Sequence, residues 1–394
     1  MRDLLLLALL LAAVAIGWWL GRRERRKAGA APGSPNLARD YFVGLNYLLN
    51  DQQDRAIETF IGALEVNSDT IETHIALGNL FRSRGEADRA VKIHQNLLAR
   101  PTLTGDQGDR VQLELSRDFL QLGLLDRAER LLRGLIKDTA GDEHRHAARC
   151  LLADLLEREG EWQQALDVAQ PHLVRHSDDR RRAAAHWLCE LAEAERHSAS
   201  PVLARRHLKQ ALATDARCVR ANLLLAEMAL DTGQYRQAIR LLQRIPEQDK
   251  AFVPTLLAPL ERAYRLLDDE DGLIRHLETL LEHAPYTSVI IRLAEALRRH
   301  RGDTEAATAL LTRQLERTPS LGGLDYLMGL YRQQEGDGED RRLTLLQHHT
   351  GSLLEAAPRH RCRRCGFSGE QLHWQCPRCR SWGTTKPITG IEGE

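Results

Sequence analysis

The chain has 394 residues and equal numbers of basic and acidic side chains, 55 Lys and Arg against 55 Asp and Glu. Aromatic residues make up only 5% of the chain while Leu, Ala, Arg and Glu recur throughout, a composition that favours helices and nearly excludes an all-β architecture. Seven cysteines are too few for a disulfide scaffold, and the zero net charge argues against a chain that binds nucleic acid over its whole surface.

The first predicted element is a membrane-spanning helix. Residues 4–20 are 17 consecutive residues without a charge, which as a helix span about 26 Å and nearly match a hydrocarbon core about 30 Å thick. Trp18 and Trp19 stand where a cleaved secretory signal needs small residues, so we favour a retained anchor over that alternative. Gly17 and Gly21 have the spacing that lets two membrane helices approach closely, which leaves a homodimer and a chance match as alternatives.

A basic segment follows the apolar run directly. Its basic side chains are Arg22, Arg23, Arg25, Arg26 and Lys27. The positive-inside rule places such a segment on the cytoplasmic side of a membrane, so we expect everything after the anchor of residues 1–21 to be cytoplasmic. Residues 22–35 end in a stretch of Gly, Ala, Ser and Pro, and we expect them to link the anchor to the globular part.

Residues 36–320 contain a repeat with a period near 34 residues. A small residue recurs in the second helix of each predicted unit, and four of its seven intervals equal 34 residues. This spacing predicts about eight tetratricopeptide units, which are helix pairs that stack into a superhelix with a concave inner surface. Residues 321–357 lack the pattern and are predicted to be capping helices. The recurring small residues are Ala56, Ala90, Ala128, Ala165, Ala204, Ala238, Gly272 and Ala306.

Glycines and prolines mark the turns and the irregular parts of this array. The seventh unit departs from the pattern, because Leu260 replaces a small residue and two prolines, Pro254 and Pro259, interrupt the predicted first helix. Where a first helix must stop, a left-handed turn favours glycine. Four units have a glycine at this turn, namely Gly85, Gly123, Gly160 and Gly233.

Polar residues of the second and third units form a candidate partner groove on the inner surface. Asn79, Arg82 and Arg117 lie one or four positions after the small residue of their first helix, which are the inward-facing positions. The arginines predict a site for an acidic peptide or a carboxylate, and the alternative is that these side chains are simply solvated. The same positions in the fourth unit hold Asp154 and Glu157.

The most specific chemical pattern lies near the C-terminus. Two Cys-x-x-Cys pairs, Cys362 with Cys365 and Cys376 with Cys379, are separated by ten residues. Each pair places two thiolates on one tight turn, so two pairs can bind one metal ion tetrahedrally, and the spacing does not decide between zinc and iron. Four ligands leave no open position, which predicts a structural ion rather than a catalytic one. A redox dithiol and two disulfides are the alternatives.

The predicted metal module comprises residues 358–394. Six arginines and one acid lie between Pro358 and Arg380, and we interpret them as offsetting the charge of the thiolates rather than as a nucleic-acid site. Trp374 and Trp382 are predicted to pack the module against the last helices. The sequence contains none of the nucleotide-binding, metalloprotease or serine-hydrolase motifs that we sought, so we expect a protein that is not an enzyme.

Strings at both ends and in the second repeat resemble the bacterial lipopolysaccharide assembly protein B family. They are Gly17-Trp18 with Gly21-Arg22-Arg23 at the anchor, LGNLFRSRGE at residues 77–86, and CRRCGF and WxCPxC in the tail. The resemblance covers essentially the whole chain. It implies an all-α protein with one helix in the inner membrane, a periplasmic N-terminus, a cytoplasmic tetratricopeptide array and a rubredoxin-like metal module, or zinc ribbon. The implied ligands are Cys362, Cys365, Cys376 and Cys379.

The same resemblance implies an adaptor. Family members are understood to promote degradation of the deacetylase of the lipid A pathway by a membrane ATP-dependent metalloprotease, which limits lipopolysaccharide synthesis. Two alternatives stay open at this point. One is a scaffold that assembles lipopolysaccharide biosynthetic enzymes at the membrane, and the other is a redox or metal-handling protein that uses the four-cysteine site.

Overall fold

The computed structural model describes residues 71–101, 103–139, 141–197, 200–334, 341–391 and 393, together with six isolated positions between 43 and 59. The predicted anchor, its glycine spacing, the basic segment and linker, and most of the first repeat unit lie outside the described residues. Among the helices that are described, none is long and apolar enough to cross a bilayer. The chain divides into two compact units, residues 1–122 and 123–394, which are treated separately below.

The first unit contains three described helices that pack around a small apolar core. They are α4 (Ile71–Ser83), α5 (Ala87–Leu98) and α6 (Gly105–Gln121). Thr104 begins α6 with a capping box, because its hydroxyl accepts the Gln107 N–H while the Gln107 side chain accepts the Thr104 N–H. The core residues are Ile71, Ile75, Phe81, Ala90, Ile93, Leu97 and Val111.

A close approach between α4 and α5 explains one of the small residues of the repeat. A Cβ atom at Gly78 would lie 2.4 Å from Nε2 of the fully buried His94 ring. The ring is fixed on its other side, since its Nδ1 lies 2.5 Å from the Asp118 carboxylate of α6. Gly78 is therefore required by packing, because any side chain at this position would displace a buried histidine.

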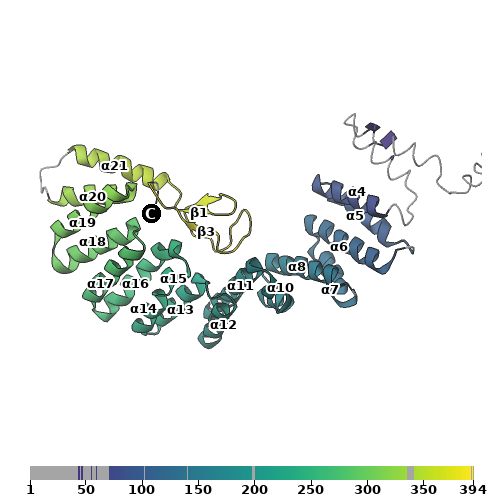
Figure 1. The fold of residues 1–394 in the computed structure, drawn as a ribbon, viewed down its shortest axis with the longest axis horizontal. Coiled ribbons are helices and arrows are strands. Elements are labelled where there is room, and N and C mark those ends of the chain that lie inside the picture. Colours follow the sequence, from purple (N-terminus) through teal and green to yellow (C-terminus); the bar gives the residue numbers. More distant parts are fainter. Residues whose placement is uncertain are drawn as a thin grey trace, which may run out of the picture. The chain divides into compact units, whose positions relative to one another are not determined.

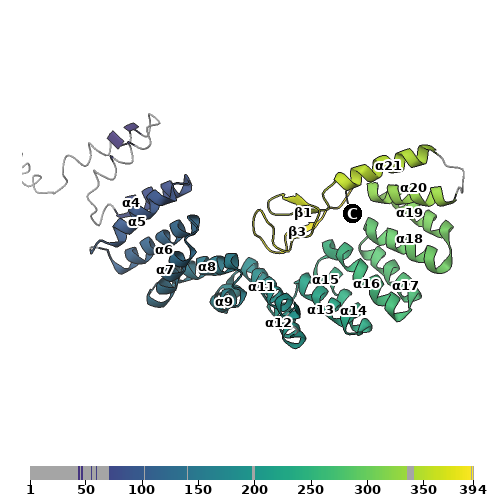
Figure 2. The ribbon, with the colours of Figure 1, turned by 180° about the vertical axis from the view of Figure 1, so that it is seen from behind.

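The second unit is a series of helix pairs followed by the metal module (Figure 1; Figure 2 shows the reverse side). Neighbouring helices along the chain pack against each other, as expected for stacked repeats. Its helices are α7 (Leu125–Asp138), α8 (Asp142–Glu159), α9 (Trp162–Ala169), α10 (His172–His176), α11 (Asp178–His197), α12 (Pro201–Thr214), α13 (Val219–Asp231), α14 (Tyr235–Leu242), α15 (Ile245–Gln248), the 3-10 helix η1 (Lys250–Phe252), α16 (Val253–Leu267), α17 (Glu270–His283), α18 (Thr287–Arg301), α19 (Thr304–Arg317), α20 (Leu321–Gln334) and α21 (Arg341–Ala356).

The repeat pattern read from the sequence corresponds to buried positions in these helices. The recurring alanines from Ala90 to Ala238 are fully buried, whereas Ala306 is only half-buried. The four turn glycines have φ between 73° and 87°, so the left-handed turns predicted there are confirmed. The helical array of paired helices is thus confirmed for the residues that the structure describes.

The seventh unit is more regular than its sequence suggests. The prediction that Pro254 and Pro259 interrupt its first helix is wrong, because α16 runs continuously from Val253 to Leu267. Pro254 lies in the first turn, where no intrahelical partner for its missing N–H is needed. Leu260 is fully buried, so the larger side chain contributes to the core instead of separating the helices.

The C-terminal module is a small antiparallel sheet that follows α21. Its strands are β1 (His360–Cys362), β2 (Ser368–Gly369) and β3 (Thr385–Pro387), in the order β2-β1-β3. Cys362 pairs with Thr385 in the β1–β3 ladder. In Figure 1 the module lies beside the middle helices of the second unit, on the side to which α21 returns the chain.

Candidate metal centre

Two tight turns of the module carry the four cysteines. In the first turn the Gly366 N–H donates to the Cys362 carbonyl at 3.0 Å, and in the second the Arg380 N–H donates to the Cys376 carbonyl at 2.8 Å. Both donors adopt left-handed backbone conformations, with φ of 75° at Gly366 and 56° at Arg380. The two turns are therefore equivalent knuckles, with glycine in one and arginine in the other.

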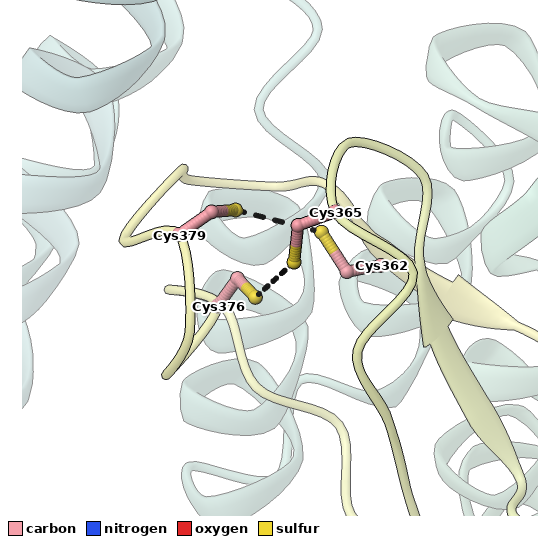
Figure 3. Close-up of side chains that lie close together, drawn as sticks. All are labelled: Cys362, Cys365, Cys376 and Cys379. Atoms are coloured by element: carbon pink, nitrogen blue, oxygen red, sulfur yellow. Dashed lines mark hydrogen bonds between the residues drawn. The ribbon is translucent and has the colours of Figure 1, made fainter.

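The four sulfur atoms face a common point (Figure 3). All four Sγ atoms lie within 4.8 Å of one another. The distance is 3.7 Å between Cys362 and Cys379 and 3.6 Å between Cys365 and Cys376. A tetrahedral ion with metal–sulfur bonds near 2.3 Å requires sulfur–sulfur distances of about 3.8 Å. The residues therefore fit one four-coordinate ion without rearrangement.

The thiols of the two knuckles differ in acidity. Burial alone would raise the pKa of Cys362, but the Thr384 hydroxyl 3.3 Å away and the N–H groups of Cys365 and Arg364 lower this pKa to about 6. Burial raises the pKa of Cys376 to about 12, with the Cys365 and Cys362 thiols acting in the same direction. Four thiolates this close repel one another, so a divalent cation is needed to hold all four in the ionised form.

One buried carboxylate connects the module to the helical array. Glu157 of α8 accepts the indole N–H of Trp382 at Oε2, at 2.8 Å, and the same oxygen accepts the indole N–H of Trp187 of α11, also at 2.8 Å. Its other oxygen accepts the Gln375 side-chain amide at 2.7 Å. Glu157 thus joins two helices and the second knuckle in a single hydrogen-bond network.

Aromatic stacking completes this contact. The His186 ring of α11 stacks on Trp382, with centroids 5.0 Å apart, and Trp374 stacks on Phe252 of η1 at 5.3 Å. The Lys386 ammonium lies 3.8 Å above the Phe252 ring. The expectation that the two tryptophans pack on the last helices is wrong. They pack on α8, α11 and η1, because α21 returns the chain to the middle of the array, and only the tail beyond β3 contacts the start of α20.

Burial also determines the protonation of the docking histidine. His186 is buried, and its Nδ1 has no hydrogen-bond partner among the described residues. Burial, together with the positive charges of Arg220, Arg182 and Lys386, lowers the pKa of His186 well below 6.5. The stacked ring is therefore neutral at pH 7.

The predicted groove residues of the first unit are already paired with carboxylates. The Arg82 guanidinium lies 2.5 Å from the Glu114 carboxylate and 2.8 Å from the Asp118 carboxylate, and it also donates to Asn79. Arg117 pairs with Glu114 as well. This balance removes the charge argument for an acidic ligand at Asn79, Arg82 and Arg117.

Sequence reasoning missed the docking network, although one signal was present. The repeat pattern placed Glu157 on the inner surface, where the structure has the module contact, but nothing local identified Trp187, His186 or Phe252 as its partners. A search for unpaired buried acids opposite tryptophan-bearing segments is the signal that could have found this contact.

Comparisons with known proteins agree with this architecture. A family model described as a rubredoxin metal binding domain matches residues 360–387, and tetratricopeptide repeat models match residues 73–191 and 199–254. Lipopolysaccharide assembly protein B of Escherichia coli (strain K12) is 36% identical over 392 residues, with 99% of each chain covered. The protein of the same name from Haemophilus influenzae is 34% identical over 406 residues, with 100% of each chain covered. Among solved structures, a tetratricopeptide repeat protein from Parabacteroides merdae is 13% identical and covers 72% of this chain and 100% of its own, with a TM-score of 0.32.

Proposed function

The chain belongs to the lipopolysaccharide assembly protein B family, and from this we propose that it is an inner-membrane adaptor that regulates lipopolysaccharide synthesis. In this proposal it promotes proteolysis of the lipid A pathway deacetylase by a membrane ATP-dependent metalloprotease. The observation that carries the proposal is the length of the match, which covers 99% of both chains and so includes the apolar N-terminus, the repeats and the metal module.

The proposed anchor gives the adaptor its physical advantage. Residues 1–21 would span the inner membrane, with the basic residues from Arg22 to Lys27 on the cytoplasmic side. Confining a client-binding protein and a protease to one membrane raises their effective concentration without any new contact between them. The helical array would then hold the client and the anchor would bring it to the protease.

We assign the metal ion a structural role in this adaptor. Cys362 and Cys376 are buried, and four thiolate ligands leave no position for a substrate or a water. When bound, the ion supplies only crosslinking of the two knuckles. The residues of the chain do the rest, since Trp382 and Gln375 beside the second knuckle dock on Glu157.

The half-life of the deacetylase tests the proposal directly. It is measured after synthesis is stopped in cells that contain the full chain, no chain, or a chain lacking residues 1–27. We expect a short half-life only with the full chain, and the truncated protein should remain folded and metal-loaded. A half-life that does not depend on the protein would contradict the adaptor and favour the scaffold. Full control by the truncated form would contradict the role of the anchor.

A further inference from the structure

A cleft separates the metal module from the helices beside it. Its cavity of about 520 Å³ is lined by residues of α8, of the first turns of α11 and of both knuckles. Arginines dominate the lining, and we call the site the arginine cleft. It is defined by Arg158 of α8, Arg180 and Arg182 of α11, and Arg364 and Arg380 of the two knuckles.

Only one of these arginines has a close carboxylate partner. Arg180 donates both terminal nitrogens to the two carboxylate oxygens of Asp154, at 2.5 and 3.0 Å. This is the bidentate geometry in which a guanidinium is fully engaged. Arg158, in contrast, is exposed and forms no ion pair with any residue in the described part of the chain.

The other three arginines have only long contacts to acids. Arg182 and Arg364 share the exposed carboxylate of Asp179, at 3.4 and 3.6 Å, and Arg380 lies 3.8 Å from a Glu157 oxygen. These distances exceed the 2.7–2.9 Å of a strong charge-assisted hydrogen bond. Glu157 is moreover occupied by two indole N–H groups and the Gln375 amide. The cleft therefore holds guanidinium groups that can rearrange toward an incoming anion.

The backbone at Arg380 supports a function for its side chain. The equivalent residue of the first knuckle is Gly366, and both positions have positive φ, which glycine adopts most easily. Turn geometry alone would thus favour glycine at both knuckles. An arginine at this position directs a guanidinium into the cleft at the expense of a less favourable backbone conformation.

The charge of the metal site does not cancel this positive potential. Between residues 358 and 391 the module carries seven basic side chains and one acidic side chain, a surplus of six positive charges. Four thiolates around a divalent ion contribute two negative charges, which leaves a clear positive excess. A ligand that meets this surface is attracted when it is anionic.

We propose that the arginine cleft binds an acidic peptide segment of a protein client. Side-chain carboxylates of the segment would replace the long contacts of Arg182, Arg364 and Arg380 with close ones, and would give Arg158 a partner. The cavity has the size of a specific ligand site. The choice of a protein as the ligand rests on the proposed adaptor function, whereas the affinity for carboxylates rests on the cleft itself.

Peptide binding to the purified full chain in neutral detergent tests this inference. The probe is a fluorescein-labelled decapeptide of alternating Glu and Ser, and the matched control peptide has Gln in place of Glu. Fluorescence anisotropy should show binding of the Glu peptide that is at least about tenfold tighter than that of the Gln peptide and that weakens with salt. Equal binding of the two peptides, or none, would overturn the proposal.

Three variants locate the binding site. Arg380→Gly removes a cleft guanidinium while keeping a residue suited to positive φ, and Arg158→Gln removes another without touching the knuckles. Arg378→Gln is the matched control, since Arg378 is an exposed arginine of the same knuckle that does not line the cleft. We expect about three- to tenfold weaker binding for each cleft variant and less than twofold for the control, at unchanged metal content.

The remaining outcomes also decide between sources of the effect. Equal weakening by Arg378→Gln and Arg380→Gly would show diffuse attraction and would overturn the cleft as a site. Binding of inorganic pyrophosphate that depends on Arg380, without binding of the Glu peptide, would identify a phosphate site and overturn the peptide. All these measurements use purified protein, so their failure is distinguishable from a deacetylase half-life that does not respond to the chain.

Discussion

Trp382 of the metal module donates its indole N–H to Glu157 of α8 at 2.8 Å, although 225 residues separate them in the sequence. The same oxygen accepts the indole N–H of Trp187. The carboxylate is nearly inaccessible to solvent, so each of its hydrogen bonds replaces one that water would otherwise provide. The position of the module on the array therefore depends on one acidic side chain.

Replacing this carboxylate should release the module. Glu157→Ala leaves two buried indole N–H groups and the Gln375 amide without their acceptor, and we expect a loss of about 2–4 kcal/mol in the free energy of unfolding. Chemical denaturation followed by tryptophan fluorescence measures this loss. Asp154→Ala on the same helix is the control, because Asp154 is half-exposed and its pair with Arg180 contributes less than about 1 kcal/mol. Equal effects of the two variants would contradict the central role of Glu157.

The two helical glycines of the first unit should respond to alanine in opposite directions. Gly78→Ala places a Cβ atom 2.4 Å from the buried His94 ring, which Asp118 prevents from moving, so we expect a destabilisation of about 1–3 kcal/mol. Gly108→Ala in α6 meets no atom within 4 Å and should stabilise by about 0.5–1 kcal/mol. Denaturant midpoints of the two variants test this pair. A neutral Gly78→Ala would show that the ring can shift without cost.

The sequence predicted those features whose signals are local or periodic. The four cysteines are recognisable because each pair occupies four consecutive residues, and the repeat is recognisable because small residues recur near 34. The docking site lies outside this reach, because the contact between Glu157 and Trp382 depends on where α21 returns the chain. No pattern within either segment specifies that meeting.

The groove interpretation failed for a reason that repeat periodicity explains. Arg82 pairs with Glu114 and Asp118, which lie 32 and 36 residues further along the chain. One repeat is about 34 residues, so these acids occupy the neighbouring turn positions of the next first helix. A basic residue on the inner surface of a repeat protein should therefore be compared with the residues one period away before it is considered free to bind a ligand.

Acid should weaken the docking of the module through His186. The pKa of this histidine in the folded protein lies well below its unfolded value near 6.5, so below pH 6.5 the unfolded chain binds a proton that the folded chain does not. Stability is therefore fully present above pH 6.5 and decreases as the pH falls, by up to about 1.4 kcal/mol per pH unit. His186→Phe keeps a ring between the tryptophans and should remove this contribution to the slope. Unfolding curves between pH 5.5 and 7.5, at constant metal content, test it, and an unchanged slope in the variant would exclude His186.

Removal of the metal should loosen the module while leaving the helices in place. The module has about 30 residues and little core of its own, so the ion and the docking contacts must hold it together. After chelation we expect hydrogen exchange to increase in residues 360–387, helical circular dichroism to change little, and re-addition of zinc to restore protection. Cys376→Ser should reproduce the chelated state, whereas Cys150→Ser, which alters a cysteine of α8 outside the cluster, should not. An iron-loaded, coloured protein that cycles with reductant and stays protected in both oxidation states would instead favour the redox alternative, because a purely structural ion has no need of two stable oxidation states.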